Sequence, residues 1–161
     1  MQLSKNFSLS EFTKSSTAVR LEIENIPTKR HIENMKYLCE KITQPARDHF
    51  GSINISSGYR SKELCLAIGS SVTSFHAIGC ADDSEVKDQE VSNFEYLLWI
   101  YENCDFTELI AEYFDEDDNK AGWVHSAIQK GRENERTLKL KDKDHNYEVV
   151  TIEYLKELYL K

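Results

Sequence analysis

A histidine and an aspartate seven residues apart, His76 and Asp83, are the first residues in this sequence whose types and spacing could do chemistry. The histidine ends a polar loop and Gly79 permits a tight turn. The aspartate then lies in a segment that we expect to be a strand, with the small Ala81 on the same face. Imidazole nitrogen and carboxylate oxygen are zinc ligands, and catalytic zinc sites combine three protein ligands with water. The pair therefore fits either part of a metal site or an ordinary hydrogen bond in a turn.

His125 is the candidate for a third ligand. It lies in residues 123–125 (WVH), which we expect to be extended, so that Trp123 and His125 point to the same face. A single histidine on a strand is also commonly a packed core residue. For the remaining histidines, two near helix ends and one in a turn, we expect structural or solvent-exposed roles: His31, His49 and His145.

Three motifs in order along the chain resemble those of the M15 zinc peptidases. They are residues 56–61 (SSGYRS), the pattern Ser-x-His-x-x-Gly-x-Ala-x-Asp over residues 74–83, and Trp-Val-His at residues 123–125. This family includes D-Ala-D-Ala carboxypeptidases and phage L-alanyl-D-glutamate endopeptidases. Its small phage- and prophage-type members have openings similar to residues 6–12 (NFSLSEF) and a stretch like residues 44–51 (QPARDHFG). The resemblance extends roughly from Leu3 to Ser126.

The resemblance implies one zinc ion with three protein ligands: His76, Asp83 and His125. It also implies that Arg60 binds a carboxylate of the peptide substrate, because a guanidinium can grip a carboxylate with two parallel hydrogen bonds. A surface salt bridge would explain the same arginine. We expect three further residues to contact the substrate, although aromatic residues at such positions are as often part of a core: Tyr59, Ser74 and Trp123.

The sequence departs from the family pattern around these motifs. Family members often have Gly-Gly-Ser-Lys-Thr-Ser-Gln-His where this chain has residues 69–76 (GSSVTSFH). They often have Ala-Ala-Asp in place of residues 81–83 (ADD), and Trp-Val-His-Val-Ser in place of residues 123–127 (WVHSA). The three zinc ligands survive every change, so the departures affect the expected substrate contacts and cleavage specificity.

The general base must come from an unusual place. Many M15 members carry it three residues before the last zinc histidine, and that position is Gly122 here. A hairpin centred on residues 118–119, whose residue types tolerate positive φ, would place Glu112 opposite His125 on the same face. We therefore predict that Glu112 is the catalytic base. The alternative is that Glu112 is a solvated strand carboxylate, like Glu108 and Glu116.

Capping residues and hydrophobic periodicity indicate the elements that must position these side chains. We expect helices at residues 8–12, 28–51 (disturbed by Pro45), 61–67, 92–102 and 151 onward, with loops at 13–27 and 69–79. We expect strands at residues 52–56, 80–86, 109–114 and 123–128, and a hairpin of 137–141 with 147–150. Helices first and hairpins later predict an α+β fold with helices on a small antiparallel sheet. The resemblance implies the hedgehog/D-Ala-D-Ala peptidase type.

Length and composition indicate a single domain and disfavour nucleic-acid and membrane binding as its function. The 161 residues suit a single domain over 1–161, which we expect to be a monomer. A net charge of −8 is unfavourable for binding nucleic acid or anionic membranes. We find no transmembrane segment and no signal peptide, so we expect synthesis in the cytoplasm. The four cysteines lack ligand spacing, and we expect free thiols: Cys39, Cys65, Cys80 and Cys104.

Together these features predict a zinc metallopeptidase that hydrolyses peptide bonds of bacterial peptidoglycan. We expect a D,D-carboxypeptidase or L,D-endopeptidase type of lytic enzyme, encoded by a phage or prophage, that acts on the stem peptide after release or as part of a virion. One alternative is a catalytically silent virion or wall-binding protein that keeps the fold. Another is a zinc amidohydrolase with a different substrate.

Overall fold

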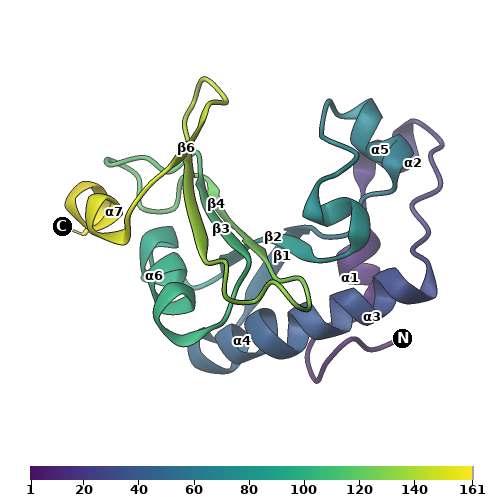
Figure 1. The fold of residues 1–161 in the computed structure, drawn as a ribbon, viewed down its shortest axis with the longest axis horizontal. Coiled ribbons are helices and arrows are strands. Elements are labelled where there is room, and N and C mark those ends of the chain that lie inside the picture. The colour runs from purple at the N-terminus through teal and green to yellow at the C-terminus, as the bar shows by residue number, and fades with distance from the viewer. Residues whose placement is uncertain (161) are drawn as a thin grey trace.

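A six-stranded sheet organises the computed structural model, which describes residues 1–160 (Figure 1). The strands in chain order are β1 (Ile53–Ser57), β2 (Ala81–Val86), β3 (Glu108–Glu112), β4 (Trp123–Ala127), β5 (Thr137–Lys141) and β6 (Tyr147–Val149). Their order across the sheet is β1-β2-β4-β3-β5-β6. The fold is α+β, as predicted.

The sheet is mixed, which corrects the expected antiparallel arrangement. β3 and β5 run parallel, with Glu108 beside Thr137 and Glu112 beside Lys141, whereas the other neighbouring pairs are antiparallel. The direction has a simple cause. The last residue of β4 lies beside the first residue of β3, and the connection over residues 128–136 returns the chain to that same end of the strands. β5 therefore starts beside the start of β3 and follows it.

Seven α-helices and two other helical segments complete residues 1–160. The α-helices are α1 (Leu9–Thr13), α2 (Ser16–Arg20), α3 (Lys29–Leu38), α4 (Gln44–Phe50), α5 (Lys62–Ala67), α6 (Asn93–Asn103) and α7 (Ile152–Tyr159). The other two are the π-helical turn η1 (Cys39–Thr43) and the 3₁₀ helix η2 (Phe75–Ile78). None of these helices is long and apolar enough to span a bilayer.

Polar N-caps begin the helices at the predicted places. Thr28, Ser61, Ser92 and Thr151 each accept a hydrogen bond from the backbone N–H three residues on. Capping residues and hydrophobic periodicity did not predict two short helices, which lie in segments expected to be loops. These are α2, within residues 13–27, and η2, within residues 69–79.

Pro45 disturbs the long helix as predicted. The chain is helical from Lys29 to Phe50, but η1 interrupts the α-helical pattern directly before Gln44 and Pro45. Proline has no N–H to donate to the preceding turn, and a π-helical turn is one way in which a helix absorbs such an interruption. The helix ends at Gly51.

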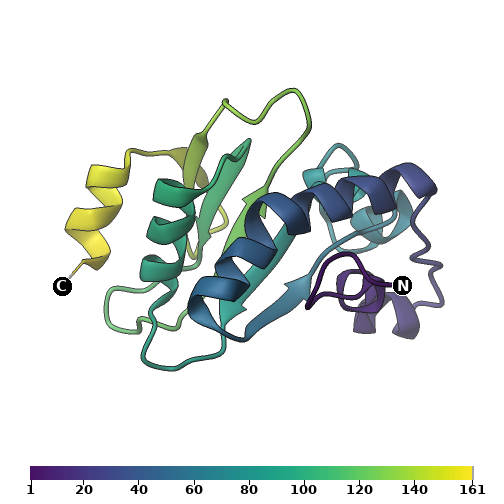
Figure 2. The same ribbon diagram turned by 90° about the horizontal axis from the view of Figure 1, so that it is seen from below.

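One face of the sheet is apolar and packs against helices. Figure 2 shows α3, α4 and α6 crossing this face. Leu109, Ala111 and Val124 point into a core that includes fully buried Met35 and Leu97. The other strand face carries the polar candidates, because side chains alternate along a strand. The four cysteines are buried, and none of them forms a disulfide.

Candidate metal centre

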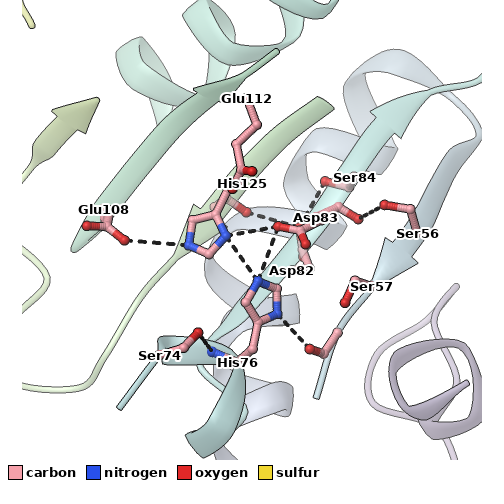
Figure 3. A network of polar contacts seen from close by, with 12 residues as sticks. Ser56, Ser57, Ser74, His76, Asp82, Asp83, Ser84, Glu108, Glu112 and His125 are labelled. Atoms are coloured by element: carbon pink, nitrogen blue, oxygen red, sulfur yellow. Dashed lines mark hydrogen bonds and ion pairs between the residues drawn. The ribbon is translucent and has the colours of Figure 1, made fainter. Parts of the chain in front are cut away.

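Three side chains that could hold a metal ion converge at the open face of the sheet. They are His76 from η2, Asp83 from β2 and His125 from β4, and one ligand atom from each lies within 4.8 Å of the others. His125 Nδ1 and His76 Nε2 lie 2.9 and 3.2 Å from Asp83 Oδ1, and 3.1 Å from each other (Figure 3). All three residues are buried. Two imidazole nitrogens and a carboxylate oxygen form a donor set typical of zinc.

Strand register brings Asp83 and His125 together. The two residues are direct partners in the antiparallel β2–β4 pair, so their side chains share one face. The third residue, His76, is placed by the short helix η2, whose N-cap Ser74 accepts a hydrogen bond from the His76 N–H at 3.2 Å. The cluster therefore depends on two strands and one helical turn that are far apart in sequence.

The carbonyl of Gly58 sets the orientation of His76. The His76 Nδ1–H donates to Gly58 O at 2.7 Å, which leaves the lone pair on Nε2 directed at the cluster. Gly58 approaches the Phe12 backbone so closely that a Cβ would lie 2.5 Å from Phe12 O. The glycine of the 56–61 motif is thus needed to bring this carbonyl to the histidine.

The surroundings of Asp83 and His76 favour the protonation states that a metal ion requires, whereas those of His125 favour its protonated ring. Burial alone would raise the pKa of Asp83, but His76 and His125 hold it well below its usual range. Burial lowers the pKa of His76 and outweighs the opposing effect of Asp83. Burial also acts to lower the pKa of His125, yet Asp83 and two nearby glutamates raise it above its ordinary value. An ionised Asp83 and a neutral His76 are suited to metal binding.

Arg60 lies directly beside this cluster. Its Nη2 is 2.9 Å from Asp83 Oδ2, so Asp83 has one oxygen on the histidines and the other on the guanidinium. The Arg60 Nε donates to Ser57 Oγ at 3.1 Å, while Nη1 is 3.5 Å from Ser70 Oγ. The Arg60 side chain is only 16% exposed, and its ion pair with Asp83 lies in the cleft, not on the surface.

Glu112 shares the face of His125 but does not oppose it. Ile110 is the partner of His125, and Glu112 is the partner of Trp123, so the predicted register is wrong by two residues. The 113–122 connection is not a symmetric turn, because the Asn93 amide donates to the carbonyl oxygens of residues 120–122 and fixes them from outside the hairpin. A shift of two residues keeps a side chain on its face. Glu112 therefore lies diagonally across from His125.

Gly122 leaves no room for the glutamate that the family resemblance would place at this position. Its φ is +72°, and a Cβ there would lie 1.9 Å from the carbonyl oxygen of Glu112. A side chain at residue 122 would therefore collide with the backbone of β3. The candidate base has to come from another position.

Two glutamates of β3 flank His125, and each pairs with a lysine of β5. Glu112 Oε2 is 2.9 Å from Lys141 Nζ, and Glu108 Oε2 is 2.5 Å from Lys139 Nζ. Their side chains are 8% and 15% exposed, so neither is the solvated strand carboxylate considered from the sequence. Glu108 was missed as a site residue because its place near His125 depends on the β3–β4 register, and its contact with Lys139 depends on the β3–β5 pairing; neither has a local sequence signal.

A cleft of about 1000 Å³ opens over the cluster. Its lining includes every residue predicted to contact substrate: Tyr59, Arg60, Ser74 and Trp123. The β5–β6 hairpin forms another part of the wall. The Lys141 ammonium lies 4.9 Å from the ring centres of both Tyr113 and Tyr147, and the Tyr113 hydroxyl is 2.6 Å from His145 Nδ1. The role of His145 in this wall was not predicted.

Comparison with known protein families supports the resemblance seen in the sequence. A family model described as Peptidase M15 matches residues 5–126. The match includes the three clustered residues and Glu112, whereas β5, β6 and α7 lie beyond it. No curated protein sequence matches the chain.

Proposed function

The chain belongs to the M15 peptidase family, and from this premise we propose that it is a zinc-dependent peptidase that hydrolyses peptide bonds of bacterial peptidoglycan. The observation that carries the proposal is the convergence of His76, Asp83 and His125 at the base of a large cleft. The family match alone supports a peptidase. The cluster of His76, Asp83 and His125 adds a site that could bind the catalytic metal ion.

The proposed ligands of a single zinc ion are His76 Nε2, Asp83 and His125 Nδ1. A zinc ion held by these residues would polarise the scissile carbonyl and would lower the pKa of a bound water towards about 7. The donor atoms already face one another, and the second nitrogen of His76 is fixed by Gly58. The neighbouring histidines hold the pKa of Asp83 below its usual range, and Arg60 pairs with its other carboxylate oxygen.

Glu112 is the proposed general base. It lies on the cleft face one diagonal step from His125. Lys141 binds its Oε2, which leaves Oε1 to take the proton of the attacking water and pass it to the leaving amine. This role does not require the direct opposition that the sequence predicted, because a general base can act through one water molecule.

The proposed substrate is the stem peptide. The Nη2 of Arg60 is committed to Asp83, so the Nη1 edge, with its long contact to Ser70, is the part we assign to a substrate carboxylate. Tyr59, Ser74 and Trp123 line the path of the peptide. A D,D-carboxypeptidase and an L,D-endopeptidase both fit this arrangement. A phage or prophage enzyme of this kind reaches the wall after release or on a virion.

Zinc content and muropeptide digestion test the proposal together. The purified protein should contain one zinc per chain and cleave defined muropeptides, with mass spectrometry identifying the bond. A chelator should abolish cleavage and added zinc should restore it. Tight binding to cell walls without cleavage would favour the silent wall-binding protein instead. Zinc-dependent hydrolysis of other amides, with intact muropeptides, would favour the amidohydrolase.

A further inference from the structure

The second ring nitrogen of His125, Nε2, is buried and has no hydrogen-bond partner within residues 1–160. The other nitrogen, Nδ1, faces Asp83 and His76. A neutral imidazole carries a single proton, so a metal ion on Nδ1 requires that proton to reside on Nε2. A buried N–H without an acceptor is destabilising. The site therefore needs an acceptor on the side of the ring opposite the cluster.

Glu108 has a carboxylate oxygen on that side. Its Oε1 lies 3.6 Å from His125 Nε2, across the ring from Asp83 and His76 (Figure 3). The other oxygen, Oε2, accepts a hydrogen bond from Lys139 Nζ at 2.5 Å. The lysine belongs to β5, beyond the part of the chain that the family model matches. It fixes one oxygen of Glu108 and leaves the other directed at the histidine.

We infer that Glu108 is a positioning residue for the metal centre, and that Lys139 holds it in place. In this arrangement Glu108 Oε1 accepts the hydrogen bond from the His125 Nε2–H. The bond selects the tautomer with a free Nδ1 and fixes the ring so that Nδ1 points at the metal. Carboxylates that bind the distal nitrogen of a metal-ligating histidine act in this way in many metal sites. The inference rests on the metal site of the proposed function.

The separation of 3.6 Å is longer than a hydrogen bond, whose usual length is about 2.9–3.0 Å. A metal ion on Nδ1 commits the proton to Nε2 and makes it a stronger donor. We expect the Glu108 carboxylate and the His125 ring to move closer to each other when a metal ion binds. The backbone of β3 is held by strands on both sides, so any adjustment falls to the Glu108 side chain. This side chain is 15% exposed in the cleft and therefore has room to move towards the ring.

Glu112 provides a matched comparison. It lies four residues along the same strand and face, and it also pairs with a lysine of β5. Its strand partner is Trp123, and its charge is engaged by Lys141. A general effect of negative charge near His125 should therefore appear on removal of either glutamate. An effect of ring positioning should appear only on removal of Glu108.

The test is the zinc affinity of the full chain, measured without substrate by competition with a chromophoric chelator. Glu108→Ala should weaken zinc binding by about 10–100-fold, whereas Glu112→Ala should change it by less than about threefold. Glu108→Gln keeps an acceptor oxygen and should recover most of the affinity. Long-range ¹H–¹⁵N spectra of the zinc-loaded protein should show His125 protonated at Nε2, with faster exchange of that proton in Glu108→Ala.

Several outcomes would overturn the inference. Unchanged zinc affinity in a folded Glu108→Ala protein would do so, as would equal losses in Glu108→Ala and Glu112→Ala. If Glu108→Ala does not fold, Lys139→Met becomes the decisive variant: weaker zinc binding supports the inference, and unchanged binding overturns it. A wild-type protein that binds no zinc overturns both this inference and the proposed function.

The measurement also separates this inference from the proposed activity. A protein that binds zinc through Glu108-dependent positioning but cleaves no muropeptide would refute the activity alone. A protein that cleaves muropeptides but binds zinc equally well without Glu108 would refute the positioning role alone.

Discussion

Two adjacent aspartates meet opposite surroundings on the two faces of β2. Asp83 points into the cleft, where its oxygens contact histidine nitrogens and the guanidinium of Arg60. Asp82 points to the helix-covered face and is fully buried. Its carboxylate accepts hydrogen bonds of 2.7, 2.9 and 3.1 Å from three hydroxyl groups: Thr43, Ser84 and Ser126.

The difference shows what a buried carboxylate needs in order to stay ionised. Burial raises the pKa of Asp82 to about 6, even though three hydroxyls donate to it. Burial acts on Asp83 as well, but the histidines hold its pKa far below the usual range. Hydroxyl groups satisfy the oxygens without supplying charge, whereas charged partners offset the lost solvation. Only Asp83 is therefore prepared to bind a cation.

Removal of the carboxylate charge from Asp83 should have the largest effect in the molecule. Asp83→Asn replaces a proposed ligand, so we expect zinc affinity to fall further than the 10–100-fold typical of outer positioning partners. Peptidase activity should fall with it. The variant also leaves Arg60 beside an uncharged group, so thermal unfolding should be followed in parallel. Zinc binding near the wild-type level would show that the cluster is not the metal site.

Loss of the proposed base should be the next largest effect and should leave the metal in place. Glu112→Gln is nearly isosteric but cannot accept the proton, and loss of a general base typically costs about 10²–10⁴ in rate. Glu116→Gln, in the loop between β3 and β4, is the control and should retain most of the activity. Turnover and zinc content must be measured on the same samples, because metal loss would mimic base loss. Wild-type turnover with full zinc would remove Glu112 from the mechanism.

The features of this site that depend on local sequence could be predicted, and those that depend on the pairing of distant segments could not. Caps such as Ser61 and Ser92 act over a few residues, and strand alternation separates Asp82 from Asp83, so the sequence predicts these features. The observed β3–β4 register includes a connecting loop whose carbonyl oxygens accept hydrogen bonds from Asn93, a residue of α6 outside the hairpin. No pattern within the hairpin could reveal it.

The parallel pairing of β5 with β3 was equally inaccessible from the sequence. It places Lys139 beside Glu108 and Lys141 beside Glu112, although the two strands are separated by β4 in the chain. Alternating lysines in a short strand resemble an ordinary solvated face. Their function as partners of cleft carboxylates appears only once the strand order is known.

A smaller effect is expected from Asp82. Asp82→Asn keeps the size of the side chain but replaces one acceptor oxygen with an NH₂ group that faces hydroxyl donors. We expect a loss of about 1–3 kcal/mol in the free energy of unfolding, as for other mispaired buried polar groups. Zinc affinity and turnover should stay close to wild type because the side chain points away from the cleft. Loss of zinc without loss of stability would contradict the separation of the two faces.

The smallest expected effect is a dependence of Asp82 stabilisation on pH, measured in chelator-treated protein. The folded-state pKa of about 6 lies above the ordinary value of 3.8, so the folded protein holds the Asp82 proton more tightly than the unfolded chain. This contribution is complete below pH 3.8 and is lost as the pH rises through 6. The unfolding free energy of wild type minus that of Asp82→Asn should therefore decrease between pH 4 and 7. Denaturant unfolding at several pH values measures this difference, because other titrating groups are shared by both proteins and largely cancel. A difference that stays constant, or that grows with pH, would show that the hydroxyl groups around Asp82 stabilise its ionised form as effectively as the histidines stabilise that of Asp83.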